Sequence, residues 1–156
     1  MNTEPDVLSY HPNKLSILSL NAQSLLSKID DLRVECLAHG YDIIVSETWL
    51  SSQIVDLEIS IPGYTVARRV RDRHGGGLAI YFNSRISYTL LSSLYPDLEL
   101  LLFECHMYSR PLTICSIYRP PNSSPGYLTK FHFTLTSLSS SNLENLIICG
   151  DFNILM

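Results

Sequence analysis

Two polar residues follow a short apolar segment near the end of the sequence. Residues 146–149 are apolar with β-branched members, which predicts a buried strand, and Gly150 ends it. Asp151 and Asn153 follow, and in an extended segment side chains two positions apart point the same way. A carboxylate and a carboxamide converging at a strand end suit a hard divalent cation and a phosphate substrate. An ordinary turn is the simpler alternative, since turns favour both residue types.

Other predicted strands also end in side chains that can bind a metal ion or a phosphate. They are Asn21 after residues 15–20, Glu47 after residues 42–46, and Tyr118 after residues 112–117, followed by Arg119 and Asn122. Loops at strand ends are where open α/β architectures place their ligands, so we expect these side chains to share one site. Glu47 carries the most weight because a carboxylate beside an apolar strand is costly to bury without a partner.

The remaining pattern predicts the elements that position these residues. Leu25, Ile29, Leu32 and Cys36 recur at helical spacing, and Gly40 is a plausible helix stop. A second helix is expected over residues 123–140, with one apolar stripe and Pro125 near its start. The other expected strands are residues 64–70, 78–82, 86–91 and 98–107. Strands joined mostly by turns, with helices in two places, favour a mixed sheet packed on a second sheet with helices outside.

Composition describes a chain that folds. Apolar residues make up 46% and charged residues 17% of the 156 residues, so the chain can bury a core. The net charge of −4 gives no general attraction to nucleic acid, so any contact with DNA must be local. The basic cluster at residues 68–74, which contains Arg71 and Arg73, either is a solvated face or contacts DNA phosphates.

Cysteine spacing and hydropathy bear on the compartment. The four cysteines are widely spaced in apolar segments, which favours buried free thiols in a reducing compartment over zinc ligands. Residues 1–13 are polar and are expected to form a flexible lead-in without a signal-peptide core. With no apolar run long enough to span a membrane, the expected location is nuclear or cytoplasmic.

Five motifs occur in an order that resembles a known family. They are Leu20–Ser24, Ser46–Leu50, Gly75–Tyr81, Ile117–Pro121 and Gly150–Asn153. Together they resemble the endonuclease/exonuclease/phosphatase superfamily, and within it the apurinic-like endonuclease domain of LINE-type non-LTR retrotransposons. The resemblance covers residues 14–156 and implies a four-layer α/β sandwich, two mixed β-sheets flanked by helices. The chain is expected to hold the first half of that domain plus one strand of the second.

The resemblance also implies roles for individual residues. Glu47 would be the principal ligand of a catalytic Mg²⁺ or Mn²⁺, and Asn21 would assist that metal or orient a phosphate oxygen. Asp151 and Asn153 would align and deprotonate the attacking water and hold the scissile phosphate. Tyr118 would donate a hydrogen bond to a phosphate oxygen. Substrate contacts are expected from Arg119, Asn122, Arg71 and Arg73, although the family often has one residue fewer between the tyrosine and the asparagine.

The family's chemistry also needs a late histidine in a Ser-Asp-His segment. All five histidines precede Asp151, so none occupies that position, and we expect the 156 residues to have little nuclease activity by themselves. Lost strands would leave apolar sheet surface uncovered and favour association. One alternative is a non-enzymatic truncated remnant or binding fragment. Another is a phosphatase or phospholipase of the same superfamily, which the residues of the motifs favour less.

Overall fold

A computed structural model describes residues 14–71, 76–91, 93, 95–107 and 111–153 of the chain. All eight predicted strands are present. The elements in chain order are β1 (Ile17–Asn21), α1 (Leu25–His39), β2 (Ile43–Glu47), β3 (Tyr64–Arg69), β4 (Leu78–Asn83), β5 (Ser87–Leu90), β6 (Leu100–His106), β7 (Leu112–Tyr118), α2 (Gly126–Thr136), α3 (Ser140–Glu144) and β8 (Leu146–Asp151).

The strands form two mixed sheets of four strands. The first has the order β1-β2-β4-β3, in which β1 and β2 are parallel and the other pairs antiparallel. The second has the order β5-β6-β7-β8, in which only β7 and β8 are parallel. Each parallel pair is joined through helical segments, as parallel strands require a long crossover. The two sheets are also contiguous in sequence, one before residue 84 and the other after residue 86.

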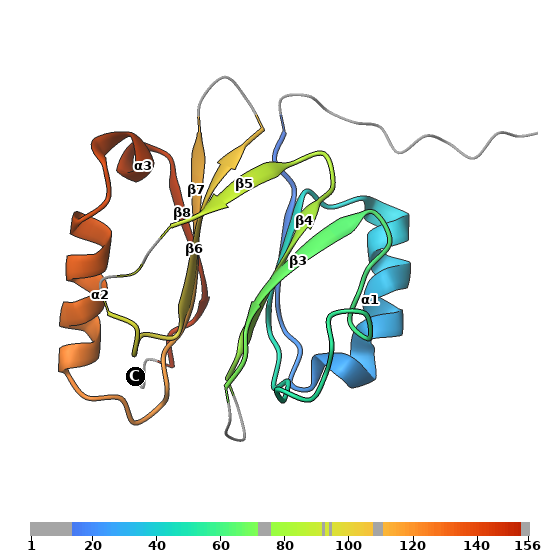
Figure 1. Ribbon diagram of the computed structural model, residues 1–156, viewed down its shortest axis with the longest axis horizontal. Helices are drawn as coiled ribbons and strands as arrows, with labels where there is room; N and C mark the ends of the chain where they lie inside the picture. The colour runs from blue at the N-terminus through green and yellow to red at the C-terminus, as the bar shows by residue number, and fades with distance from the viewer. Residues whose placement is uncertain (1–13, 72–75, 92, 94, 108–110, 154–156) are drawn as a thin grey trace, which may run out of the picture.

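The sheets lie face to face and the helices cover their outer faces (Figure 1). Helix α1 packs on the first sheet through the four residues of its predicted stripe, which are all buried. Helix α2 packs on the second sheet through Tyr127 and Phe131. Between the sheets, Phe82 of β4 meets Phe103 of β6 edge to face, with ring centroids 5.2 Å apart. The predicted four-layer α/β sandwich is therefore confirmed.

Helix α1 ends as its sequence predicts. Gly40 has a φ of +60°, and its backbone N–H donates to the Cys36 carbonyl at 2.8 Å. A left-handed residue at this position satisfies carbonyl groups that the last helical turn leaves unpaired. The helix stop sends the chain directly into β2, whose far end carries Glu47.

The second predicted helix is interrupted. Instead of one helix over residues 123–140, α2 ends at Thr136 and the short α3 begins at Ser140. The backbone N–H of Asn142 donates to the Ser139 hydroxyl at 3.3 Å, so Ser139 caps a new helix. Leu135 and Leu138 still pack against the second sheet, as the predicted stripe requires.

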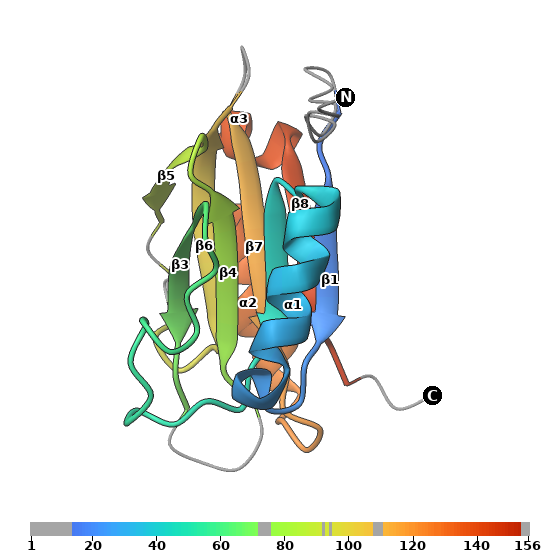
Figure 2. The ribbon, with the colours of Figure 1, turned by 90° about the vertical axis from the view of Figure 1, so that its right-hand side faces the viewer.

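Strands β1 and β8 are edge strands, one in each sheet, and the residues of both are half-buried or exposed. Figure 2 shows them at the same end of the sandwich, where they contact each other. Ile148 of β8 is exposed. Association through apolar surface at these edges stays a prediction.

The cysteine thiols are free and lie within the layers. Cys36, Cys105 and Cys115 are buried, and Cys149 is half-buried. Burial raises the pKa of Cys36 to about 11 and the pKa of Cys115 to about 12, so both remain protonated thiols at neutral pH. Among the described residues, no helix is both long enough and apolar enough to cross a membrane.

Candidate active site

The parallel pairing of β1 and β2 brings Asn21 and Glu47 together. They are partners in the register and end their strands at the same level. The Asn21 amide nitrogen donates to Glu47 Oε2 at 2.7 Å, and the Gln23 backbone N–H donates to Asn21 Oδ1 at 3.2 Å. Because Oδ1 accepts from the Gln23 N–H, the amide nitrogen of Asn21 is the end that faces Glu47. Asn21 therefore orients the Glu47 carboxylate.

Two further donors hold the other oxygen of Glu47. The Trp49 indole N–H donates to Glu47 Oε1 at 2.7 Å, and the Gly76 backbone N–H donates to the same atom at 3.3 Å. Glu47 is only 7% exposed, and these donors offset the cost of burying its charge. Trp49 and Gly76 were not predicted as its partners, although both lie in motifs that carry the family resemblance.

The glycine-rich segment before β4 clamps the residues that follow β2. The backbone N–H groups of Thr48 and Trp49 donate to the carbonyls of Gly77 and Gly76, at 3.0 and 2.9 Å. Gly77 has a φ of +77°, and a Cβ there would come within 2.9 Å of Thr48 Oγ1. The positive φ and this close approach both favour glycine at position 77, and the segment forms a tight connection that holds Thr48 and Trp49 in place.

Glu99, which precedes β6, ties this clamp to the second sheet. It accepts a hydrogen bond from the Gly77 N–H, and its Oε2 lies 3.4 Å from Arg71 Nη1. Burial raises the pKa of the Glu99 carboxyl, while the Gly77 N–H and the Arg71 charge act against that rise. Sequence reasoning missed Glu99, because no nearby residue marks it as part of a site.

Tyr118 ends β7 beside this group. It is 7% exposed, its backbone N–H donates to the Glu99 carbonyl at 2.9 Å, and Arg71 lies over its ring. Burial, and then the negative charge of Glu47, raise the pKa of the Tyr118 phenol. The phenol therefore stays protonated near neutral pH and can donate a hydrogen bond.

Asp151 lies opposite Tyr118 in the β7–β8 register, but the turn after it differs from the extended geometry that we expected. Strand β8 ends at Asp151, and Asn153 has a φ of +41°. The Asn153 backbone N–H donates to Asp151 Oδ1 at 2.9 Å, and its side-chain amide donates to the Arg119 carbonyl at 2.9 Å. Asp151 and Asn153 thus form an Asx turn, so the argument from strand alternation does not apply to them.

Arg119 holds this turn from the β7 side. Its backbone N–H donates to the Asp151 carbonyl at 2.8 Å, and Nη1 donates to the carbonyls of Phe152 and Asn153 at 3.2 and 3.0 Å. Arg119 is thereby committed to positioning residues 151–153. Its contact with substrate stays a prediction. Asn122 is exposed beyond it, and Arg73 lies outside the described residues.

One cavity of about 240 Å³ connects the two sheets at their strand ends. Asn21 and Glu47 line it from the first sheet, and Gly150 and Asp151 line it from the second. Among the described residues, no group of three or more His, Cys, Asp or Glu side chains could hold a metal ion. The cavity instead offers two carboxylates with room between them.

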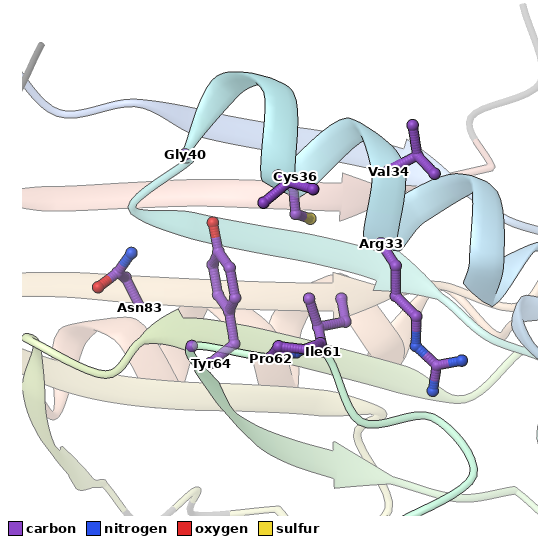
Figure 3. A pocket seen from close by; sticks show the side chains of 10 residues that line it. Arg33, Val34, Cys36, Gly40, Ile61, Pro62, Tyr64 and Asn83 are labelled. Carbon is purple, nitrogen blue, oxygen red and sulfur yellow. The ribbon is translucent and has the colours of Figure 1, made fainter. Parts of the chain in front are cut away.

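Two other hollows differ in character. One of about 530 Å³ lies next to the first cavity and is lined by Trp49, Arg71 and Tyr118 among others. The other, of about 380 Å³, lies against α1 and is lined mostly by apolar groups, including Cys36, Ile61 and Tyr64 (Figure 3). The described residues that line the pocket on α1 include no carboxylate, whereas those that line the strand-end cavity include two.

Solved structures resemble this chain, although no family model and no curated protein matches it. TDP2 from D. rerio, crystallised with a single-strand DNA product, is 16% identical, with a TM-score of 0.66 over 92% of this chain and 62% of its own. The endonuclease domain of TRAS1, a telomere-specific non-LTR retrotransposon, is 15% identical, with a TM-score of 0.67 over 92% and 61%. An endonuclease/exonuclease/phosphatase family protein from Bacteroides thetaiotaomicron is 16% identical, with a TM-score of 0.63 over 92% and 65%.

The chain therefore has the fold of the endonuclease/exonuclease/phosphatase superfamily, as the five motifs predicted. It spans 61–62% of the length of the TRAS1 and TDP2 structures. The likeness at 15–16% identity establishes the fold.

Proposed function

We propose that this chain carries the metal- and phosphate-binding part of a metal-dependent DNA endonuclease of the non-LTR retrotransposon class. One observation carries the proposal: Glu47, oriented by Asn21 and Trp49, lines the same cavity as Asp151. The likeness to the TRAS1 endonuclease domain and to TDP2 with a DNA product supports DNA as the substrate.

The donor set fits Mg²⁺ or Mn²⁺. Mg²⁺ binds one or two carboxylates and fills its remaining positions with water and substrate phosphate. Glu47 supplies one carboxylate, Asp151 lines the opposite side of the cavity, and the volume of about 240 Å³ has room for water molecules. Asn21 holds Glu47 from behind, as partners of metal ligands commonly do. When bound, the metal ion would neutralise charge on the phosphate and lower the pKa of a bound water.

The other residues would align the phosphate and the attacking water. Asp151 would align the attacking water and accept its proton. The Asn153 N–H fixes Asp151 through Oδ1, and Arg119 fixes the turn through the carbonyls of residues 152 and 153. The protonated phenol of Tyr118 would donate to a phosphate oxygen as negative charge develops there. On this proposal, the residues of this chain bind the metal ion and align the phosphate and the attacking water.

Binding is therefore the activity to test first. Replacing Glu47 by Gln keeps the size and one of the two acceptor oxygens but removes the charge, so Mn²⁺ binding measured by calorimetry should be lost. Replacing Asn21 by Ala should weaken it about 10–100-fold, the range seen when a partner of a metal ligand is removed. Glu144→Gln, which changes an exposed glutamate on α3, should bind as the unmodified chain does. Equal Mn²⁺ binding by the unmodified chain and Glu47→Gln would contradict the proposal.

Hydrolysis should be weak in the 156-residue protein. The described residues that line the strand-end cavity include no histidine, and groups that act as a unit lose most of their effect when one is missing. A supercoiled plasmid incubated with the purified protein and Mg²⁺ should stay mostly closed on an agarose gel. Efficient nicking that disappears in Glu47→Gln would show that these residues suffice for catalysis.

A further inference from the structure

The hollow beside the strand-end cavity has the side chains of a nucleotide-binding surface. Its volume is about 530 Å³, and its lining includes Trp49, Arg71, Tyr118, Pro121, Asn122 and Ser123. It adjoins Glu47 directly, because the Trp49 indole N–H donates to that carboxylate at 2.7 Å. A molecule whose phosphate is bound through a metal ion at Glu47 would extend into this hollow.

Trp49 is fixed in place yet presents its ring to solvent. It is 47% exposed, which is high for the largest apolar side chain. Its backbone has a φ of +52°, a costly conformation for a non-glycine residue, held by the bond from its N–H to the Gly76 carbonyl. With the indole N–H also bonded, the ring is immobilised before any ligand arrives. An anchored, exposed aromatic ring is a ready stacking surface.

The other walls add charge and polar contacts. The Arg71 guanidinium lies 5.8 Å from the centre of the Tyr118 ring and brings positive charge to the same hollow. Asn122 is exposed at the rim, where its amide can both donate and accept. The Ser123 hydroxyl oxygen is buried and has no hydrogen-bond partner among the described residues. Aromatic, cationic and amide groups together match a nucleobase, which has a flat face and a polar edge.

We propose that this hollow binds one unpaired nucleobase of the DNA strand, stacked on Trp49, next to the phosphate that a metal ion at Glu47 would hold. The phosphate position rests on the proposed function, whereas the base site has its own measurable signal. A base inside a duplex is covered on both faces and cannot reach the ring. The preferred substrate is therefore DNA that is single-stranded, frayed or unstacked at the site of attack.

Trp49 is the sole tryptophan of the sequence, so its fluorescence reports on this hollow alone. Adding a single-stranded pentanucleotide to the 156-residue protein with Mg²⁺ should quench the emission saturably. A pentamer of abasic sugar-phosphate units, with the same charge and no bases, should leave the emission unchanged. Saturable quenching by both oligomers, or by neither, would overturn the proposal.

Matched variants separate stacking from collisional quenching. The double variant W49F/F133W moves the single tryptophan to an exposed position on α2, where Phe133 is 50% exposed, and should show no saturable quenching. With a fluorescently labelled pentanucleotide, Trp49→Ala should weaken binding at least about tenfold, as loss of a base–aromatic stack does, and Trp49→Phe should retain most of it. Phe133→Ala should bind as the unmodified chain does. Equal binding by Trp49→Ala and Phe133→Ala would count against the stack.

The two proposals fail in different ways. If bases quench Trp49 but Mn²⁺ binding does not depend on Glu47, the base site is supported and the metal-dependent function is contradicted. If Mn²⁺ binding depends on Glu47 but bases do not quench Trp49, the metal-dependent function is supported and the base site is contradicted.

Discussion

Gly150 shows how closely the two strands at the site approach. Its φ is +133°, and a Cβ built on it would lie 1.9 Å from the Ile117 carbonyl oxygen of the neighbouring strand. Ile117 and Gly150 are partners in the parallel register of β7 and β8. Neither backbone can yield without moving Asp151, which follows immediately.

Replacing Gly150 by Ala should therefore lower the free energy of unfolding by about 3 kcal/mol or more, the upper range for overpacking a close contact. Gly63→Ala is the matched control, because Gly63 also has a positive φ, of +81°, but nothing lies within 4 Å of its added Cβ. That control should cost only about 1–2 kcal/mol. Urea denaturation curves compare the two, and equal midpoints would contradict the close approach.

At this scale the sequence located the strand-end residues but not their partners. Asn21, Glu47, Tyr118 and Asp151 could be predicted because each ends an apolar strand. The role of Glu99 could not be predicted, because it depends on how the two sheets pack together. The hydrogen bond from Trp49 to Glu47 could not be predicted either, because it depends on the left-handed backbone of Trp49. The Asn153 turn likewise depends on Arg119, 34 residues away.

Among the elements, Glu99 forms the tie between the ends of the two sheets. It joins the Gly77 N–H before β4 and the Arg71 side chain after β3 to the start of β6. Since burial raises the pKa of the folded carboxyl above its ordinary 4.5, the folded state holds that proton more tightly than the unfolded state.

This tie predicts a pH dependence. The stability that protonated Glu99 contributes is complete below its unfolded pKa and is lost as pH rises through the folded value. The free energy of unfolding of the unmodified chain, minus that of Glu99→Gln, should therefore fall as pH rises above about 4.5. Urea titrations at several pH values measure it, with Glu144→Gln as the exposed control. A difference that is flat or rising with pH would refute the buried carboxyl.

Elements with one dominant signal were predicted well. Helix α1 has a four-residue apolar stripe and a glycine stop, and both are found where expected. The break between α2 and α3 was missed because the apolar stripe continues to Leu138, whereas helix α2 already ends at Thr136. There the cap formed by Ser139 decides where α3 begins, and periodicity does not detect a cap.

For the whole molecule, the cysteines report on the integrity of the layers. Burial raises the pKa of Cys105 to about 12 and the pKa of Cys149 to about 11, and the other two thiols are raised similarly. At pH 8 a thiol reagent should label the folded protein slowly and all four sites rapidly in urea. Rapid labelling without denaturant would mean that the layers open locally.

The division of the chain into two consecutive sheets has a consequence for the site. Asn21, Glu47 and Trp49 belong to the half before residue 84, whereas Asp151 and Tyr118 belong to the half after residue 86. Neither half holds both carboxylates, so the site forms only when the two halves dock. A ligand that contacts both halves would stabilise their docking. A substitution between the sheets, such as at Phe82 or Phe103, would change the distance between the two carboxylates without contacting either one.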